Sequence, residues 1–207
     1  MTNWEISISE LDGIGVGAFN VPEHLVKWLK HNVSNKEKRN HKLSGHIKKE
    51  YGYKKWPTEL EEFIINSGSS NKKLMNYTDT ISVLSKGLPF YIDSLWVNIQ
   101  KKYEFNPLHN HEGVWSFIIF LEIPYKLKDE DEVFPKNTYN TPETSRLNFV
   151  TVDSMGGVFA NKVNVDKSFE GKMLMFPAKL PHLVYPFYTS NKYRITVSGN
   201  IKLKVVR

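Results

Sequence analysis

The apolar positions before residue 90 recur at the spacing of helices. Leu25, Val26 and Leu29 form one stripe after Pro22, and proline is well tolerated in the first turn of a helix. This pattern predicts a helix that runs to about Asn32.

Two more helices are predicted further along the same region. Thr58 and Glu61 have the spacing of a capping box, in which two side chains satisfy free backbone N–H groups at the start of a helix. Leu60, Phe63 and Ile64 then supply its buried face, and residues 74–84 predict a weaker helix. We therefore expect residues 1–88 to form a mixed, mostly helical region that packs on the rest of the chain.

From residue 90 onward the period changes to two, which is typical of strands. Leu95, Val97 and Ile99 share one face of such a segment. Further β-rich runs, separated by turn residues, occupy 114–123, 147–152, 158–165, 172–176, 183–187 and 193–203. No helices alternate with these seven or eight strands, so a parallel sheet is disfavoured and a sandwich or jelly roll is favoured. We expect residues 89–207 to form this β core, within one compact domain overall.

One long polar segment interrupts the strands. Residues 126–145 include four consecutive acidic residues and two prolines. Segments of this length without strong structural signals are either plain surface loops or functional ones. Because the segment follows a core strand, a lid over a binding site is one interpretation, and a surface loop is the other.

The composition excludes several chemistries. The chain has 207 residues and no cysteine, which rules out disulfides, thiolate metal sites and a cysteine nucleophile. No apolar run approaches the roughly 20 residues that span a bilayer, and no secretory signal is visible, so a cytoplasmic protein without a membrane partner is expected. A transition metal would need His, Asp or Glu ligands, which suits iron, manganese or zinc.

The net charge of +6 raises the question of nucleic acid as a partner. The excess gathers before residue 56, and no nucleic-acid-binding motif accompanies it. A solvated surface and a partner patch both remain open. The basic residues are Lys36, Lys38, Arg39, Lys42, Lys48, Lys49, Lys54 and Lys55.

Three histidines in the C-terminal half have the layout of a metal site. His109 and His111 are two residues apart, so on an extended segment both point to the same side. His182 lies about seventy residues later, and in a jelly roll such distant segments become neighbours. A close pair with one distant ligand can form a facial triad that leaves the opposite face of the ion open. The other four histidines lack this spacing and are interpreted as surface or structural.

The last predicted strand carries a candidate anion site. Arg194, Thr196, Ser198 and Asn200 share one face, while Ile195, Val197 and Ile201 share the other and look like core. A buried arginine beside a hydroxyl suits a carboxylate, because guanidinium can donate two parallel hydrogen bonds to it.

Taken together, these residues carry a resemblance to a known family. The segments Trp96-Val97-Asn98, Asn106-Pro107-Leu108-His109-Asn110-His111, Phe176-Pro177, His182 and Arg194-Ile195-Thr196 resemble those of iron(II)/2-oxoglutarate-dependent dioxygenases, especially prolyl-hydroxylase-like members encoded by tailed phages. The resemblance covers about residues 90–203. It implies a double-stranded β-helix, cupin-like, with Fe(II) on His109 and His182.

By the same resemblance, Arg194 binds the distal carboxylate of 2-oxoglutarate and Thr196 assists it. Asn98 and Tyr103 are further candidates for contacts with the co-substrate. The implied reaction is hydroxylation of an unactivated C–H bond in a substrate that the sequence does not identify: a peptidyl side chain, a small metabolite or a nucleotide.

His111 departs from the family pattern, which has Asp or Glu at this position. His111 is expected to be the third metal ligand. The two alternatives are that Glu112 takes its place, or that the protein binds no physiological metal. A different class of function is a non-catalytic jelly-roll module for binding or structure, such as a component of a phage particle. In that reading the partners are phage particle proteins or copies of the chain, and the location is a host cytoplasm or a virion.

Overall fold

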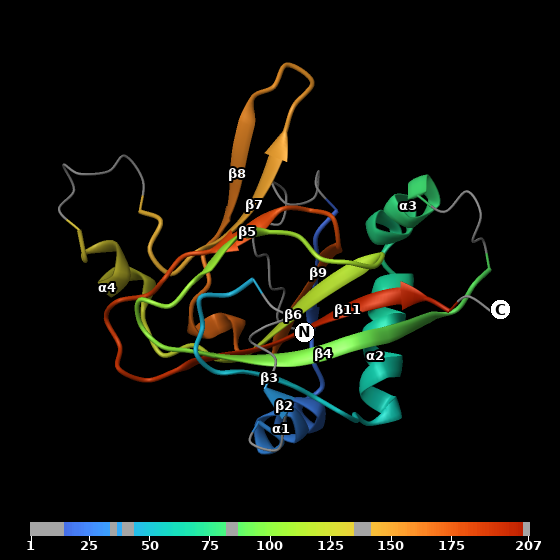
Figure 1. Cartoon of the computed structure of the whole chain (residues 1–207), viewed down its shortest axis with the longest axis horizontal. Helices are drawn as coiled ribbons and strands as arrows, with labels where there is room; N and C mark the ends of the chain where they lie inside the picture. Colours follow the sequence, from blue (N-terminus) through green and yellow to red (C-terminus); the bar gives the residue numbers. More distant parts are fainter. Residues whose placement is uncertain (1–14, 34–36, 39–43, 82–86, 135–141, 205–207) are drawn as a thin grey trace.

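Two antiparallel β-sheets face each other, and three helices cover the outer face of the larger one (Figure 1). The computed structural model describes residues 15–33, 37–38, 44–81, 87–134 and 142–204. The predicted class, a mainly β jelly roll with N-terminal helices, is confirmed.

The larger sheet has seven strands and the smaller has four. In spatial order the larger contains β1 (Gly17–Asn20), β9 (Lys172–Pro177), β6 (Trp115–Glu122), β11 (Arg194–Leu203), β4 (Phe90–Gln100), β3 (Glu50–Gly52) and β2 (Glu37–Lys38). The smaller contains β5 (Asn106–His109), β10 (His182–Val184), β7 (Leu147–Val152) and β8 (Val158–Val163), and a 3-10 turn covers Lys167–Phe169. Most predicted strand limits agree with these to within a few residues.

The large sheet buries apolar side chains on both faces, which explains its β-rich runs. Its outer face packs against α1 (Glu23–His31), α2 (Thr58–Ser69) and α3 (Lys72–Ile81). Leu29, Leu60 and Leu74 of these helices are fully buried there. On the inner face, Phe120 and Phe176 meet Phe149 of the smaller sheet, forming a second core. The space between the sheets is therefore apolar at one end.

The predicted capping box at Thr58 is wrong. Pro57 occupies the N-cap of α2, and no side chain caps the helix. Glu61 instead accepts hydrogen bonds from Trp56 Nε1 (3.0 Å) and from the backbone N–H of Ile92 (3.1 Å). The glutamate thus ties α2 to the start of β4 and does not cap its own helix.

Short strands from the N-terminal segment complete the large sheet. β1 pairs with β9, and β3 pairs with β4, so residues before 88 extend both of its sides. Sequence periodicity missed these strands because three or four residues are too few to display a period of two. The division of the chain at residue 88 remains a prediction.

The polar segment after β6 is partly helical, which the sequence did not indicate. A short helix, α4 (Leu127–Asp131), carries the buried Glu130. Its carboxylate accepts hydrogen bonds from the N–H groups of Tyr188 and Thr189 and from Thr189 Oγ1, at 2.5–3.1 Å. The helix is thereby fixed to the loop before β11. Residues 135–141 lie outside the described ranges, so the lid interpretation stays a prediction.

Two remaining expectations concern the surface. Lys36, Arg39 and Lys42 of the basic cluster lie outside the described residues, so the question of a partner patch is not tested. None of the helices in the described ranges is long and apolar enough to cross a membrane.

Candidate metal centre

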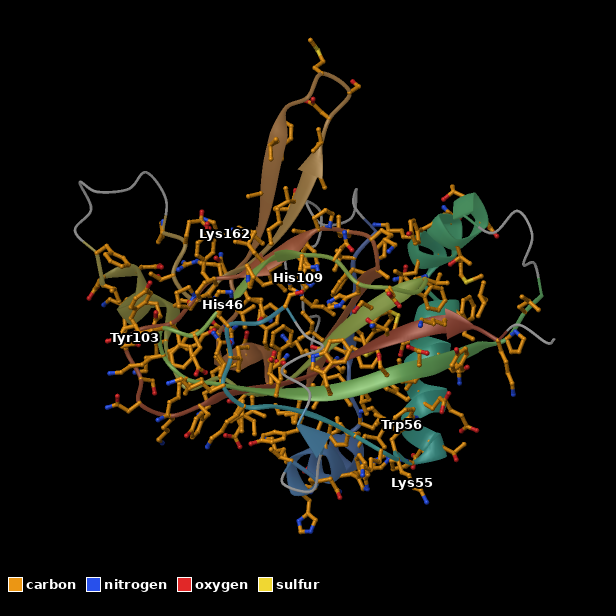
Figure 2. All side chains as sticks on the ribbon, in the orientation of Figure 1. His46, Lys55, Trp56, Tyr103, His109 and Lys162 are labelled. Atoms are coloured by element: carbon orange, nitrogen blue, oxygen red, sulfur yellow. The ribbon has the colours of Figure 1, made fainter. Side chains whose placement is uncertain are left out.

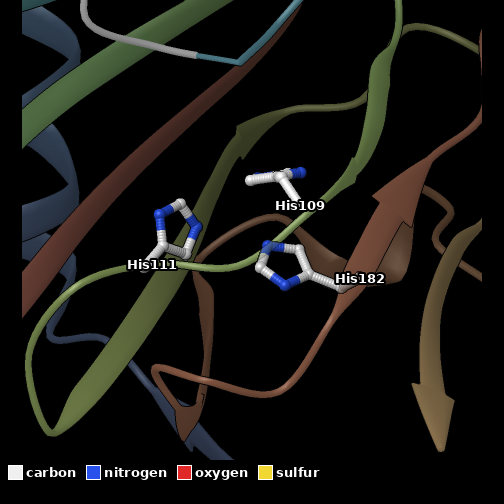
Figure 3. Close-up of side chains that lie close together, drawn as sticks. All are labelled: His109, His111 and His182. Carbon is white, nitrogen blue, oxygen red and sulfur yellow. The ribbon is translucent and has the colours of Figure 1, made fainter.

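Three histidines from two segments meet at one end of the space between the sheets (Figure 3). His109 ends β5 and His182 begins β10, and their Cα atoms are register partners in the small sheet. His111 lies in the loop after β5, where its backbone N–H donates to the carbonyl of Ala178 at 2.8 Å. The predicted juxtaposition of the close pair with the distant histidine is therefore present in the structure.

The three imidazoles are close enough to share one ion. One ligand nitrogen from each lies within 4.8 Å of the others, and the ring centroids are 4.3 to 5.0 Å apart. His182 is buried, and His109 and His111 are half-buried. Among the described residues, this is the only cluster of three potential metal-ligating side chains.

The environment keeps these imidazoles neutral. Burial, together with the neighbouring His182 and His109, lowers the pKa of His111 to about 3. Burial also lowers the pKa of His182 to about 4, with His109 adding to the effect, and it lowers the pKa of His109. Only a neutral imidazole has a lone pair for a metal, so the cluster is ready for a cation at neutral pH.

Backbone carbonyls orient two of the rings. His109 Nδ1 lies 2.7 Å from the carbonyl oxygen of Pro107, and His182 Nδ1 lies 3.0 Å from that of Leu180. A carbonyl oxygen only accepts, so each Nδ1 carries the proton and each Nε2 keeps its lone pair. This is the usual outer hydrogen bond of a metal-binding histidine. The donor set therefore fits a transition metal that accepts nitrogen ligands.

A cavity of about 620 Å³ opens beside the histidines, within the usual size of ligand sites. The inner faces of β4 and β11 line it with polar side chains. As the sequence predicted, β11 turns Arg194, Thr196, Ser198 and Asn200 into the cavity, while Val197 and Ile201 join the core under the helices.

Arg194 has a free hydrogen-bond donor inside this cavity. The residue is 5% exposed, and its Nη1 donates to Tyr125 Oη and to the carbonyl of Ser145, both at 3.1 Å. Its buried Nε has no partner among the described residues. Buried charge of this kind is costly unless a ligand completes its pairing. Its neighbours hold the guanidinium in place and leave one edge for an anion.

Next to Arg194 a row of polar side chains crosses the sheet. Glu50 of β3, Asn98 of β4 and Thr196 of β11 are register partners across three neighbouring strands. Asn98 Nδ2 donates to Thr196 Oγ1 at 3.5 Å, and the buried Asn98 Oδ1 has no partner. Five buried side-chain atoms lack a partner in the described chain, and three of them belong to cavity residues: Asn98, Asn106 and Arg194. Their concentration there indicates a place for a polar ligand.

Two residues that the sequence offered as candidates, Tyr103 for the co-substrate and Glu112 for the metal, do not join the histidine cluster. Tyr103 is 59% exposed, does not line the cavity, and stacks edge-on against Tyr188 (Figure 2, where it lies at the edge of the molecule). Its positive φ of 71° lies in a tight turn that directs the side chain outward. Glu112 lines the cavity mouth, but its carboxylate lies 3.6 Å from Lys202 Nζ and it is not part of the metal-ligating cluster.

Sequence reasoning also missed two residues of the cavity region. Tyr125 follows β6, and its hydrogen bond with Arg194 joins segments 69 residues apart. Glu50 lies among the basic residues before residue 56, and it reaches the cavity through the pairing of β3 with β4. No local pattern could have revealed either role, since both depend on pairings between distant segments.

Glu50 carries a pH-dependent cost that can be measured. It is 1% exposed, and burial, with the charge of Glu104, raises the pKa of its carboxyl from 4.5 to about 7. The protonated form is thus favoured on folding, and its stabilising contribution is complete below pH 4.5 and lost as pH rises through 7. We expect Glu50→Gln to raise the free energy of unfolding of the metal-free protein, relative to wild type, by about 2 kcal/mol more at pH 8 than at pH 4.5.

Denaturant unfolding at the two pH values measures this difference. The variant comparison cancels the opposite pH dependence of the histidine cluster, which is common to both proteins. The exposed Glu122, changed to Gln, should show the same difference from wild type at both pH values. An equally pH-independent result for Glu50→Gln would contradict the prediction.

Residues 94–200, just over half of the chain, match a family model described as "Putative 2OG-Fe(II) oxygenase". The matched segment contains all three histidines and Arg194. A comparison with curated protein sequences found no match.

Several solved structures share the fold at low sequence identity. A prolyl-4-hydroxylase from Pseudomonas putida is 12% identical, with 96% of this chain and 97% of that one covered and a TM-score of 0.53. AviO1 from Streptomyces viridochromogenes Tue57 is 10% identical, with 99% and 97% covered and a TM-score of 0.55. An oxidoreductase of the 2OG-Fe(II) oxygenase family from Burkholderia pseudomallei is 11% identical, with 94% and 87% covered and a TM-score of 0.52.

Proposed function

The chain belongs to the 2OG-Fe(II) oxygenase family, and on this premise we propose that it hydroxylates a C–H bond of its substrate with iron held by His109, His111 and His182. The family uses Fe(II) and 2-oxoglutarate, so the chain is an oxidoreductase at the level of its family. The observation that carries the proposal is a shared cavity: the histidine cluster and the unpaired edge of Arg194 open into the same space.

Arg194 is proposed to bind the distal carboxylate of 2-oxoglutarate. Its Nε is unpaired, and Thr196 Oγ1 lies on the same strand face. The guanidinium can therefore donate a charge-assisted hydrogen bond to the carboxylate, and the threonine hydroxyl can donate a second one. Asn98, whose amide reaches Thr196, is proposed to steady that hydroxyl and to contact the co-substrate. Tyr125 and the carbonyl of Ser145 keep the guanidinium in position from behind.

The protein supplies position and a dry environment, and the iron with its co-substrate supplies the oxidising chemistry. Phe176 and Phe149 pack against the ring of His182 at centroid distances of 4.8 and 5.9 Å, so one side of the cluster is shielded from water. The ring centroid of Trp96 lies 5.6 Å from that of His111. These rings limit how the imidazoles can rotate.

His111 is proposed as the third ligand although the related pattern has an acid there. Three neutral imidazoles leave the ion with more positive charge than two imidazoles and a carboxylate would. The anionic co-substrate then meets a more positive metal. The substrate is not identified. The alternative role as a component of a phage particle, and the phage origin itself, remain predictions.

Metal analysis and succinate release test the proposal together. Protein purified without oxygen should bind about one Fe(II) per chain, bind 2-oxoglutarate in calorimetry, and release succinate when oxygen is admitted. A metal-free protein that neither binds 2-oxoglutarate nor releases succinate would sink the enzyme interpretation and favour a binding or structural module.

A further inference from the structure

We propose that the side of the cavity formed by Glu50, Asn98 and Asn106 binds a positively charged nitrogen group of the substrate, an amine or a guanidinium. The inference rests on the proposed function, because it takes Arg194 to be occupied by the co-substrate. It adds the chemical class of the substrate, which neither the family nor the fold specifies.

The three side chains present hydrogen-bond acceptors to the same region. Glu50 Oε1 and Asn106 Oδ1 both lie within 2.6 Å of the position that a Cβ atom would occupy at Gly45. Asn98 is the register partner of Glu50 on the neighbouring strand, and all three residues line the cavity. A ligand group rich in N–H donors matches a wall of acceptors.

Two of these acceptors have no partner within the described chain. Asn98 is 6% exposed, and its Oδ1 is buried without a hydrogen bond although its amide N–H reaches Thr196. Asn106 Oδ1 is likewise buried and unpartnered. Buried acceptors of this kind are normally satisfied by protein, water or ligand. Asn98 lies between the two proposed contacts, because its amide N–H reaches Thr196 on the co-substrate side while its Oδ1 is left for the substrate.

The charges of the cavity favour a cation at this wall. Its lining contains one basic residue, Arg194, against the acids Glu50, Asp93 and Glu112. Asp93 and Glu112 both lie near Lys202 Nζ, at 3.0 and 3.6 Å, so the lysine balances part of their charge at the mouth. Glu50 is the acid of the interior. Once the co-substrate has neutralised Arg194, no basic side chain of the described cavity lining remains to repel a cation at this wall.

Glu50 also lowers the stability of the empty protein above neutral pH, as described above. Groups that cost stability in a cavity are often there for a ligand rather than for the fold. An ammonium or guanidinium beside Glu50 offsets that cost, because a neighbouring cation stabilises the ionised carboxylate.

Calorimetric titration with two matched probes tests the inference. Wild-type protein is loaded with Mn(II) and 2-oxoglutarate without oxygen, and then titrated with n-butylguanidinium or with the neutral n-butylurea. We expect the cation to bind at least about tenfold more tightly than the urea, with millimolar affinity. Glu50→Gln should remove about tenfold of the affinity for the cation only.

The controls separate this inference from the proposed function. Glu122→Gln, which changes an exposed carboxylate of β6 away from the cavity, should bind both probes as wild type does. Glu50→Gln should bind 2-oxoglutarate within about twofold of wild type, which shows that it is folded and loaded. Equal affinity for the two probes, no detectable binding of the cation, or an undiminished cation preference in Glu50→Gln overturns the inference alone. A wild-type protein that binds no 2-oxoglutarate contradicts the proposed function, and this inference with it.

Discussion

Replacing His182 with alanine is expected to reduce iron affinity at least 100-fold and to abolish succinate release. His182 is the ligand contributed by the second segment, and without it only the close pair His109 and His111 remains. Losing even an outer hydrogen bond of a metal site costs 10- to 100-fold in affinity, so losing a ligand should cost more. Iron content after anaerobic reconstitution and desalting measures the effect.

Two controls make this result specific. His182 is 1% exposed and packs on Phe176, so its alanine variant also loses core packing. His109→Ala, at a less buried position, should lose iron with a smaller loss of stability. His24→Ala removes an exposed imidazole of α1 that pairs with Glu59, and it should retain full iron content. Unchanged iron in both cluster variants would show that the metal binds elsewhere.

Replacing Arg194 with alanine is expected to weaken 2-oxoglutarate binding by about 100-fold or more while iron binding is retained. Removing one partner of a buried charge pair typically costs about 3–5 kcal/mol. Arg194→Lys keeps the charge without the planar fork and should lose about tenfold. The KM for 2-oxoglutarate and calorimetric binding to the iron-loaded protein measure both variants.

Arg146 offers a matched control for this experiment. It is also buried, at 4% exposed, but its guanidinium is engaged by Asp131, Asn164 and the carbonyl of Thr144, and it does not line the cavity. Arg146→Lys should lower stability and leave the KM for 2-oxoglutarate unchanged. Equal loss of iron and co-substrate in Arg194→Ala would instead indicate that Arg194 only supports the fold.

The parts of the site that follow local rules could be predicted from the sequence. A two-residue spacing placed His109 and His111 on one side, and the alternation along residues 194–200 separated cavity from core. Both depend only on the geometry of an extended chain. The long strands could be predicted for the same reason.

The parts that depend on distant pairings could not be predicted. Glu50 reaches the cavity only because three residues of β3 pair with β4, and Tyr125 reaches Arg194 only after the sheets have formed. Tyr103 was a plausible neighbour of the cofactor by position, yet a turn with positive φ directs it outward. A backbone conformation at a single residue decided that outcome.

The entry of β3 into the large sheet has a consequence for how such an enzyme can diversify. The family match begins at residue 94, whereas Glu50 belongs to a stretch that precedes it. Under the proposals above, the acidic residue of the substrate-binding wall and the metal ligands lie in separate stretches of the chain, whereas Asn98 and Asn106 of that wall lie inside the matched segment. Exchange of residues 44–53, by recombination or by grafting in protein engineering, would therefore change substrate specificity and leave the metal centre intact.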